Sequence, residues 1–214
     1  MSAYVITIMD NPKSRMVAER CIESGKKINL PIEHFPGFTP KNANLRDILT
    51  TEGINTSGFH SEYSNYNSVV AAFLGHYHLW KKSIQLNKIL FIFEHDAVLT
   101  GDLPNMTFDK VINMGKPSYG NYNIPSTFGV QPLVHKPYFG GAHAYMVSPE
   151  GAKLLVEKTK TDAGPTDVFL NTQNFPWLQE YYPWIAEARD SFTTIQKEKG
   201  CLAKHNYNEN YEIL

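Results

Sequence analysis

The chain has 214 residues, of which 42% are hydrophobic and 19% are charged, and its formal net charge is -1 at pH 7. This composition is typical of a globular protein and excludes extensive disorder, and the near-neutral charge without a lysine or arginine stripe argues against a nucleic-acid partner. Cys21 and Cys201 make neither a disulfide framework nor a zinc site. With no signal peptide and no apolar run of membrane-spanning length, we expect a cytoplasmic protein without a membrane span.

The start of the sequence predicts a strand, a helix and a second strand. Residues 4–8 are apolar and β-rich, and Asp10 or Asn11 can cap a helix that has Pro12 at its first position. Residues 32–35 form a short second strand. This spacing is typical of a βαβ unit, and therefore of an α/β protein.

A long excursion and a helix come next. Residues 36–66 are rich in Pro, Gly, Asn, Thr and Ser and predict a surface segment with a short helix at 45–51, which is either a binding loop or an irregular insertion. Apolar residues then recur every three or four positions over residues 68–86 and predict an amphipathic helix. His76 and His78 point to opposite sides of it and cannot share an ion. His76 is either a core histidine bonded to a backbone carbonyl or a residue that reaches the site.

The stretch from Lys88 to Phe93 is almost wholly apolar and predicts a strand buried on both faces, as inside a parallel sheet. Glu94, His95 and Asp96 follow it directly. Because charge is costly to bury, we expect these acids at the open carboxyl end of the strand, where ligands bind in open α/β sheets. A Glu-x-Asp pair there suits a divalent cation that bridges to phosphate oxygens; a solvated strand end is the alternative.

The second half of the chain alternates between the same kinds of element. The expected elements are a helix over residues 103–114, a loop near the site over 116–137, a strand over 138–147, a helix capped by Ser148, a short helix from Pro165 to Leu170, and a strand over 184–188. The alternation predicts an α/β fold in one domain, residues 1–196, followed by a polar tail, residues 197–214.

Five blocks of the sequence resemble, in the same order, the blocks of a known protein family. They are residues 4–8 with Arg15, 71–82, 89–97, 140–155 and 164–167. In this order they resemble glycosyltransferase family 25, the lipopolysaccharide and collagen galactosyltransferase-like proteins. The pattern of that family is a helix carrying Ser-His and Leu-Trp, then an apolar strand ending in Glu-Asp-Asp, and the blocks span most of the chain.

The resemblance implies a GT-A-like (Rossmann-like) single domain with a mixed, mainly parallel sheet flanked by helices. It implies transfer of a hexose, with galactose expected, from a UDP-sugar to a glycan or glycoconjugate acceptor with inversion, as part of reactions such as lipopolysaccharide biosynthesis. It also implies Mn²⁺ or Mg²⁺, which neutralises charge on the leaving diphosphate. Glu94 and Asp96 match the acid motif; Asp96 is the implied metal ligand, and Glu94 either shares the ion or braces the ribose or the loop.

Other binding residues are implied by the same blocks. Arg15 and the end of the first strand, Thr7 and Ile8, would lie near the nucleotide. Gly140 and Gly141 would let the chain pass close to the donor sugar, and packing glycines are the alternative.

Asp167 is the implied general base on the acceptor hydroxyl, because a carboxylate there needs only to be ionised and within hydrogen-bond reach. A helix N-cap is the alternative role for this residue. Five aromatic residues either stack on an acceptor sugar or anchor loops and core: Tyr119, Tyr122, Phe128, Tyr138 and Phe139.

The chain departs from the family pattern at two positions. His95 replaces the middle acid and weakens the local negative charge, and Gly75 replaces the serine before His76. These departures keep open the alternative of a catalytically inactive carbohydrate- or nucleotide-binding module on a GT-A scaffold. A nucleotidyl- or phosphoryl-transfer enzyme is less well supported, because no Gly-rich or Lys-rich phosphate loop is present.

Overall fold

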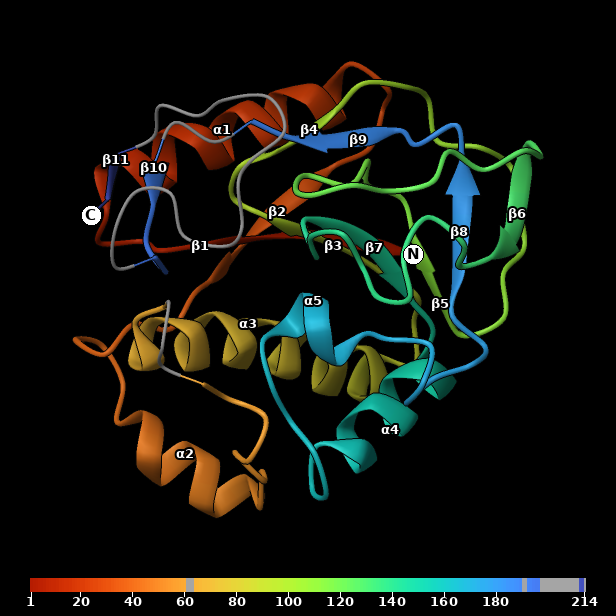
Figure 1. Cartoon of the computed structure of the whole chain (residues 1–214). Coiled ribbons are helices and arrows are strands. Elements are labelled where there is room, and N and C mark those ends of the chain that lie inside the picture. The colour runs from red at the N-terminus through yellow and green to blue at the C-terminus, as the bar shows by residue number, and fades with distance from the viewer. Residues whose placement is uncertain (61–63, 190–191, 197–211, 214) are drawn as a thin grey trace.

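A seven-stranded sheet forms the centre of the structure, a computed structural model that describes residues 1–60, 64–189, 192–196 and 212–213. In spatial order the strands are β2 (Ile32–Pro36), β1 (Ser2–Thr7), β3 (Leu90–Glu94), β7 (Ala144–Val147), β5 (Val111–Asn113), β8 (Gln179–Tyr182) and β6 (Gly129–Pro132). All of them run in one direction except β7 and β6, which are antiparallel to their neighbours (Figure 1). The prediction of a mixed, mainly parallel sheet is confirmed, and the arrangement is compatible with a Rossmann-like fold.

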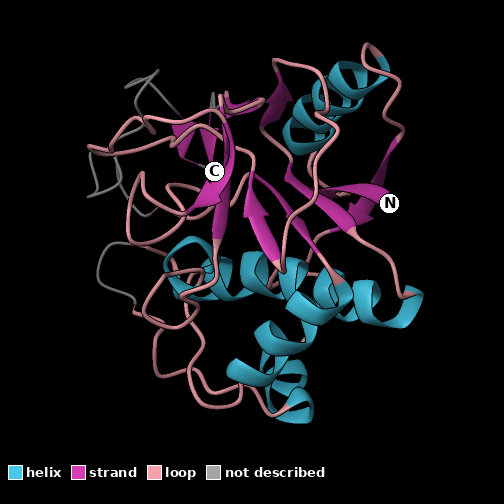
Figure 2. Ribbon diagram, turned by 90° about the vertical axis from the view of Figure 1, so that its right-hand side faces the viewer, coloured by secondary structure: helices cyan, strands magenta, loops and turns pink. Residues whose placement is uncertain are grey.

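Helices cover both faces of the sheet (Figure 2). They are α1 (Pro12–Lys26), α2 (Leu45–Glu52), α3 (Tyr66–Leu86), α4 (Pro149–Lys158) and α5 (Thr166–Phe169). One face carries α1 beside a small sheet of β4 (Ala97–Leu99) and β9 (Ala186–Ala188). The other face carries α3, α4 and α5, with α2 packed against α3.

The alternation of side chains along the central strands explains this layering. Ala3 and Val5 of β1 pack in the apolar cluster that includes α1. Tyr4 and Ile6 pack in the cluster that includes α3. In β3, the side chains of residues 90–93 are all 0% exposed. The predicted burial of this strand on both faces is therefore confirmed.

Two helices begin at capping side chains that the sequence predicts. The side chain of Asn11 accepts hydrogen bonds from the backbone N–H groups of Lys13, at 2.9 Å, and Ser14, at 3.1 Å. Ser148 caps α4 in the same way.

The helix predicted over residues 103–114 is wrong. Residues 111–113 form β5, and residues 100–110 contain no helix. Val111 and Ile112 are fully buried between β7 and β8, where β-branched side chains favour a strand. Leu103 and Phe108 lie in an irregular segment and pack against the apolar cluster that contains Ile112 and residues of α1. Their helix-like spacing therefore does not reflect a helix.

Other strand predictions hold only in part. The strand expected over 138–147 is limited to β7, and the one expected over 184–188 is limited to β9. Strands β6 and β8 are not predicted from the sequence, because the polar Gln131, Gln179 and Glu180 hide the alternation that marks a strand.

The predicted polar tail, residues 197–214, lies outside the described residues except for β11 (Glu212–Ile213), which pairs in parallel with β10 (Phe192–Thr193). In the described part of the chain, none of the helices combines the length and apolar character needed to cross a bilayer.

Glu180 of β8 anchors the loop that follows β6. Its side chain is fully buried and accepts hydrogen bonds from the backbone N–H groups of Val134, at 2.6 Å, and His135, at 2.9 Å. It also accepts from Nδ1 of His135, at 2.8 Å, and Nε1 of Trp184, at 3.1 Å. The other ring nitrogen of His135 accepts from the backbone N–H of Gly140. Since every partner in this network is satisfied, the loop is held firmly against the sheet.

Glu180→Gln is expected to lower the free energy of unfolding by about 3 kcal/mol, because the amide leaves buried donors without an acceptor. Burial raises the pKa of Glu180, but the hydrogen bond from the His135 ring, together with those from the two backbone N–H groups, holds this pKa below its ordinary value of 4.5. The ionised side chain therefore stabilises the folded state above about pH 4.5, and this contribution is lost as the pH falls through the lowered pKa. Denaturant unfolding at several pH values measures both effects.

Glu157→Gln is the matched control, since its side chain is 72% exposed, and it should change the free energy of unfolding by less than about 0.5 kcal/mol. Equal stabilities of the two variants would contradict the anchoring role of Glu180.

Candidate functional site

The carboxyl ends of three parallel strands meet at one edge of the sheet. Ile6 of β1 is in register with Phe35 of β2 on one side and with Glu94 of β3 on the other. After β1 the chain continues into α1 on one face, whereas β3 is reached through α3 on the other face. Such a reversal of the connections leaves a crevice at the strand ends, which is where open α/β sheets bind ligands.

A cleft of about 860 Å³ opens at this edge. Its walls come from the end of β1, the first turn of α1, residues 37–41 after β2, the first half of α3 and residues 192–195. This volume lies within the usual range for small-molecule sites. Glu94, His95 and Asp96 all line it. The sequence-based placement of the two acids at the open end of a buried strand is therefore confirmed.

Asp96 carries an unsatisfied acceptor. It lies in the turn between β3 and β4, and its backbone carbonyl accepts a hydrogen bond from the N–H of Arg189. Its carboxylate oxygen Oδ1 is buried and has no hydrogen-bond partner among the described residues. A buried carboxylate oxygen without a partner is costly, and a cation or a donor on a ligand would remove that cost.

His95 is tied to the start of α1. Its Nδ1 is hydrogen bonded to Oγ of Ser14 at 2.8 Å, and the same hydroxyl oxygen accepts the backbone N–H of Ile8 at 2.9 Å. The position where the family pattern has an acid thus holds a side chain that connects β3 to the strand–helix turn beside it.

A chain of hydrogen bonds leads from the core to Glu94. Nε1 of Trp80 donates to the hydroxyl of Tyr145 at 2.8 Å, that hydroxyl lies 3.0 Å from Nδ1 of His76, and Nε2 of His76 lies 3.2 Å from Oε1 of Glu94. Indole is only a donor and an ionised carboxylate only an acceptor. The hydroxyl of Tyr145 therefore donates to Nδ1, and Nε2–H of His76 donates to Glu94.

These hydrogen bonds exclude a backbone carbonyl as the partner of His76, one of the two alternatives for this residue, and place it in the site. His76 is 1% exposed, lines the cleft and bonds two side chains rather than a backbone carbonyl. Burial raises the pKa of Glu94, but the hydrogen bond from His76, together with two nearby histidines, outweighs burial and holds that pKa below its usual range. Gly75 lets α3 approach β1 closely, because a Cβ there would lie 3.1 Å from Ile6 Cγ2.

Of the three residues expected near a nucleotide, Thr7, Ile8 and Arg15, one lines the cleft and two do not. Ile8 lines the cleft. Thr7 is fully buried, and its hydroxyl donates to the carbonyl of Val5 and contacts His34. Arg15 is exposed, and its guanidinium donates to the backbone carbonyl of Met9; it does not line the cleft.

Gly140 and Gly141 lie outside the cleft lining and are packed against the loop after β5. A Cβ at Gly140 would come within 2.7 Å of Pro117. Gly141 has a φ of 111°, and a Cβ there would come within 2.6 Å of the Ser118 hydroxyl. Both glycines therefore allow the backbone to pack closely against Pro117 and Ser118, as the packing alternative describes.

Asp167 lies in the first turn of α5, whose N-cap is Pro165, so the N-cap alternative for Asp167 is wrong. The hydroxyl of Tyr119 donates to its Oδ2 and the backbone N–H of Val168 to its Oδ1. Burial raises its pKa, and the charge of Glu94 raises it further against the effect of these hydrogen bonds. Asp167 does not line the cleft, and the charge of Glu94 contributes to its raised pKa.

The five aromatic residues singled out in the sequence fall into three settings. Tyr119 and Tyr138 stack on each other beside Asp167, with ring centroids 6.4 Å apart. Tyr122 and Phe128 pack against the aromatic side chains at the end of β8, and Phe128 remains 82% exposed. Phe139 is fully buried in the core, so the packing alternative describes it.

A metal ion at this site would need ligands from its substrate. Among residues 1–60, 64–189 and 192–196, no three His, Cys, Asp or Glu side chains come together to hold an ion. Mg²⁺ is typically held by one or two carboxylates together with substrate phosphates and water. The unsatisfied oxygen of Asp96 fits the role of such a single protein ligand.

Comparison with models of known protein families gave no match to this chain. Comparison with curated protein sequences gave none either.

Sequence reasoning missed two contributors to the site. One is Ser14, in the first turn of the predicted helix. The first turn of a helix that follows a parallel strand faces the ligand edge of the sheet, so the predicted helix start could have indicated this residue. Tyr145 lies in a strand with no local feature that links it to His76, 69 positions away.

Tyr145→Phe is expected to lower the free energy of unfolding by about 1–3 kcal/mol, because it leaves Trp80 Nε1–H without an acceptor and His76 Nδ1 without a donor in the core. Denaturant unfolding measures the change. Tyr181→Phe, which removes a hydroxyl from half-buried β8, should stay within about 0.5 kcal/mol of the original protein. A Tyr145→Phe protein as stable as this control would argue against the hydrogen-bond chain.

Proposed function

We propose that the protein is a metal-dependent glycosyltransferase with a GT-A-like fold. It transfers a hexose, with galactose as the expected sugar, from a UDP-sugar to the hydroxyl of a carbohydrate or glycoconjugate acceptor. The observation that supports this most is the acid pair: Glu94 and Asp96 end a fully buried strand and line a cleft of ligand size, and one oxygen of Asp96 is buried without a partner.

The cleft has features that suit a nucleoside diphosphate. The first turn of α1 lines it through Asn11, Pro12 and Lys13, and a helix N-terminus favours the negative charge of phosphate. Phe38 offers an aromatic face in the same wall. Asp96 would hold Mn²⁺ or Mg²⁺ together with diphosphate oxygens, and the ion would neutralise charge on the departing UDP.

The protein groups divide the remaining work. Asp167 takes the proton of the acceptor hydroxyl while that oxygen forms a bond to the sugar carbon and the bond from this carbon to the diphosphate breaks. The raised pKa of Asp167 makes it a stronger base than an ordinary aspartate. Glu94, held by His76, contacts the donor through its second carboxylate oxygen.

A second candidate is a carbohydrate- or nucleotide-binding module on the same scaffold without catalytic activity. Its support is the state of the acid motif: His95 is bonded to Ser14, and one oxygen of Glu94 is bonded to His76. Release of UDP separates the two candidates, because an active transferase also transfers some sugar to water. No UDP release with any UDP-hexose and Mn²⁺ would favour the binding module.

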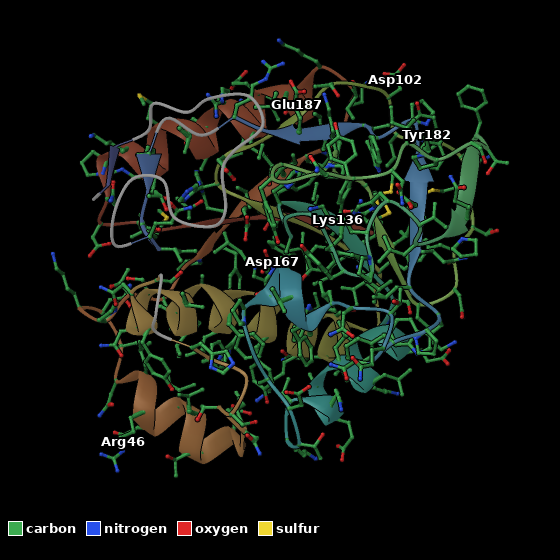
Figure 3. The ribbon with its side chains drawn as sticks, viewed as in Figure 1. Arg46, Asp102, Lys136, Asp167, Tyr182 and Glu187 are labelled. Carbon is green, nitrogen blue, oxygen red and sulfur yellow. The ribbon has the colours of Figure 1, made fainter. Side chains whose placement is uncertain are left out.

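UDP with Mn²⁺ at about 100 times its Kd is expected to raise the melting temperature by roughly 5–10 °C, and Asp96→Ala should abolish this shift. Thermal unfolding with and without both ligands measures it. Asp102→Ala is the control, since Asp102 is exposed on the loop after β4, toward the upper edge of the view in Figure 3. Equal shifts in all three proteins would refute the metal role of Asp96.

Asp167→Asn is expected to lower the rate of transfer by at least about 100-fold, with UDP binding retained, because the amide cannot take a proton. In the original protein the rate should fall on the acid side at a pH above 3.8, the ordinary pKa of aspartate, because the raised pKa keeps Asp167 protonated to higher pH. A pH profile of kcat/KM measures this. If Asp167→Asn keeps full activity, Asp167 is not the base.

A further inference from the structure

Lys136 lies on a segment that is fixed at both ends. On one side, His135 is bonded to the buried Glu180. On the other, the carbonyl of Pro137 accepts from the N–H of Thr172 at 2.8 Å, and the N–H of Phe139 donates at 3.0 Å to the residue that follows α5. This anchoring sets the backbone of Lys136 beside α5 before any ligand arrives.

The ammonium group of Lys136 sits against two aromatic rings. It lies 5.0 Å from the ring centroid of Tyr119 and 5.4 Å from that of Tyr138. It forms no ion pair with a carboxylate of the described residues. Figure 3 shows it close to Asp167, and the charge of Asp167 opposes the effect of burial, which lowers the pKa of Lys136. The two charges are thus held near each other without contact.

Asp167 keeps acceptor capacity. An ionised carboxylate offers about four lone-pair positions. Two of them are used, by the hydroxyl of Tyr119 and the N–H of Val168. The ammonium group of Lys136 has three donors, and it donates no hydrogen bond to any of the described residues. A donor and an acceptor with free capacity therefore face one space beside the tyrosine rings.

Neighbouring hydroxyls of a pyranose ring match this pair, because each hydroxyl both donates and accepts. The C–H face of the ring can pack on a tyrosine, as aromatic rings bind apolar faces. Charge decides between neutral and anionic sugars. Glu94 and Asp167 are both acidic, the charge of Glu94 acts on Asp167, and the charge of Asp167 acts on Lys136. A carboxylate or phosphate on the ligand would add to an excess of negative charge.

We propose that Lys136, Asp167, Tyr119 and Tyr138 form the subsite for the acceptor, that this subsite takes a neutral pyranose, and that Lys136 binds one of its hydroxyl groups. The proposal rests on the proposed function. Lys136 and Asp167 each hydrogen bond one of two neighbouring hydroxyls, and the hydroxyl on Asp167 is the one that becomes linked to the donor sugar.

The test uses saturation-transfer NMR with two matched pairs of sugars: methyl β-galactopyranoside with its 6-carboxylate, and methyl β-glucopyranoside with its 6-carboxylate. At least one neutral glycoside is expected to bind, about tenfold more tightly than its carboxylate partner. Lys136→Met should weaken the neutral sugar about tenfold and Lys136→Arg less. Lys116→Met, on an exposed residue of the loop after β5, should bind like the original protein.

Several results would overturn the proposal: no binding by either neutral glycoside, equal binding of a neutral sugar and its carboxylate, or unchanged binding in Lys136→Met. Melting temperatures confirm that each variant is folded. Titration of UDP with Mn²⁺ reports separately on the cleft, which Lys136 does not line. Loss of UDP binding in every protein would reject the proposed function, whereas the sugar series decides the acceptor subsite.

Discussion

The structure depends on one constraint: a strand buried on both faces has only its ends available for charge. The side chains of β3 are excluded from solvent from Leu90 to Phe93, and the next residues are Glu94, His95 and Asp96. Such groups are stable only where water, a partner or a ligand reaches them. The sheet therefore delivers its acids to the edge where β1, β2 and β3 end together, and the cleft forms around them.

The two acids meet this constraint in different ways. Glu94 is supported from inside the protein, through His76 and Tyr145 to Trp80, so one of its oxygens has a defined partner. Asp96 has an oxygen that the protein leaves without one. Their surroundings differ accordingly: the charge of Glu94 acts on neighbouring groups, including Asp167, whereas Asp96 keeps an acceptor oxygen that no described residue satisfies.

Features encoded by neighbouring residues could be predicted from the sequence. Asn11 and Ser148 cap helices through contacts within three positions, and the run before Glu94 is apolar enough to mark a buried strand. The helix expected over residues 103–114 fails because burial between β7 and β8 decides the conformation of Val111 and Ile112, and that burial comes from distant strands. The site follows the same division. The acid motif is local, whereas the partners Tyr119–Asp167 and Tyr145–His76 are 48 and 69 positions apart.

The order of the chain separates the two parts of the site. Apart from residues 192–195, the cleft is built by residues 6–96, whereas Lys136 and its two tyrosines belong to residues 116–140. The charge of Glu94 acts across this division on Tyr119 and Asp167. An exchange of residues 116–140 between related genes would therefore replace Lys136, Tyr119 and Tyr138, whereas the cleft residues 6–96 and Asp167 would be inherited unchanged. The fold allows the two surfaces to diversify at different rates, provided that Glu180 keeps its hold on the incoming loop.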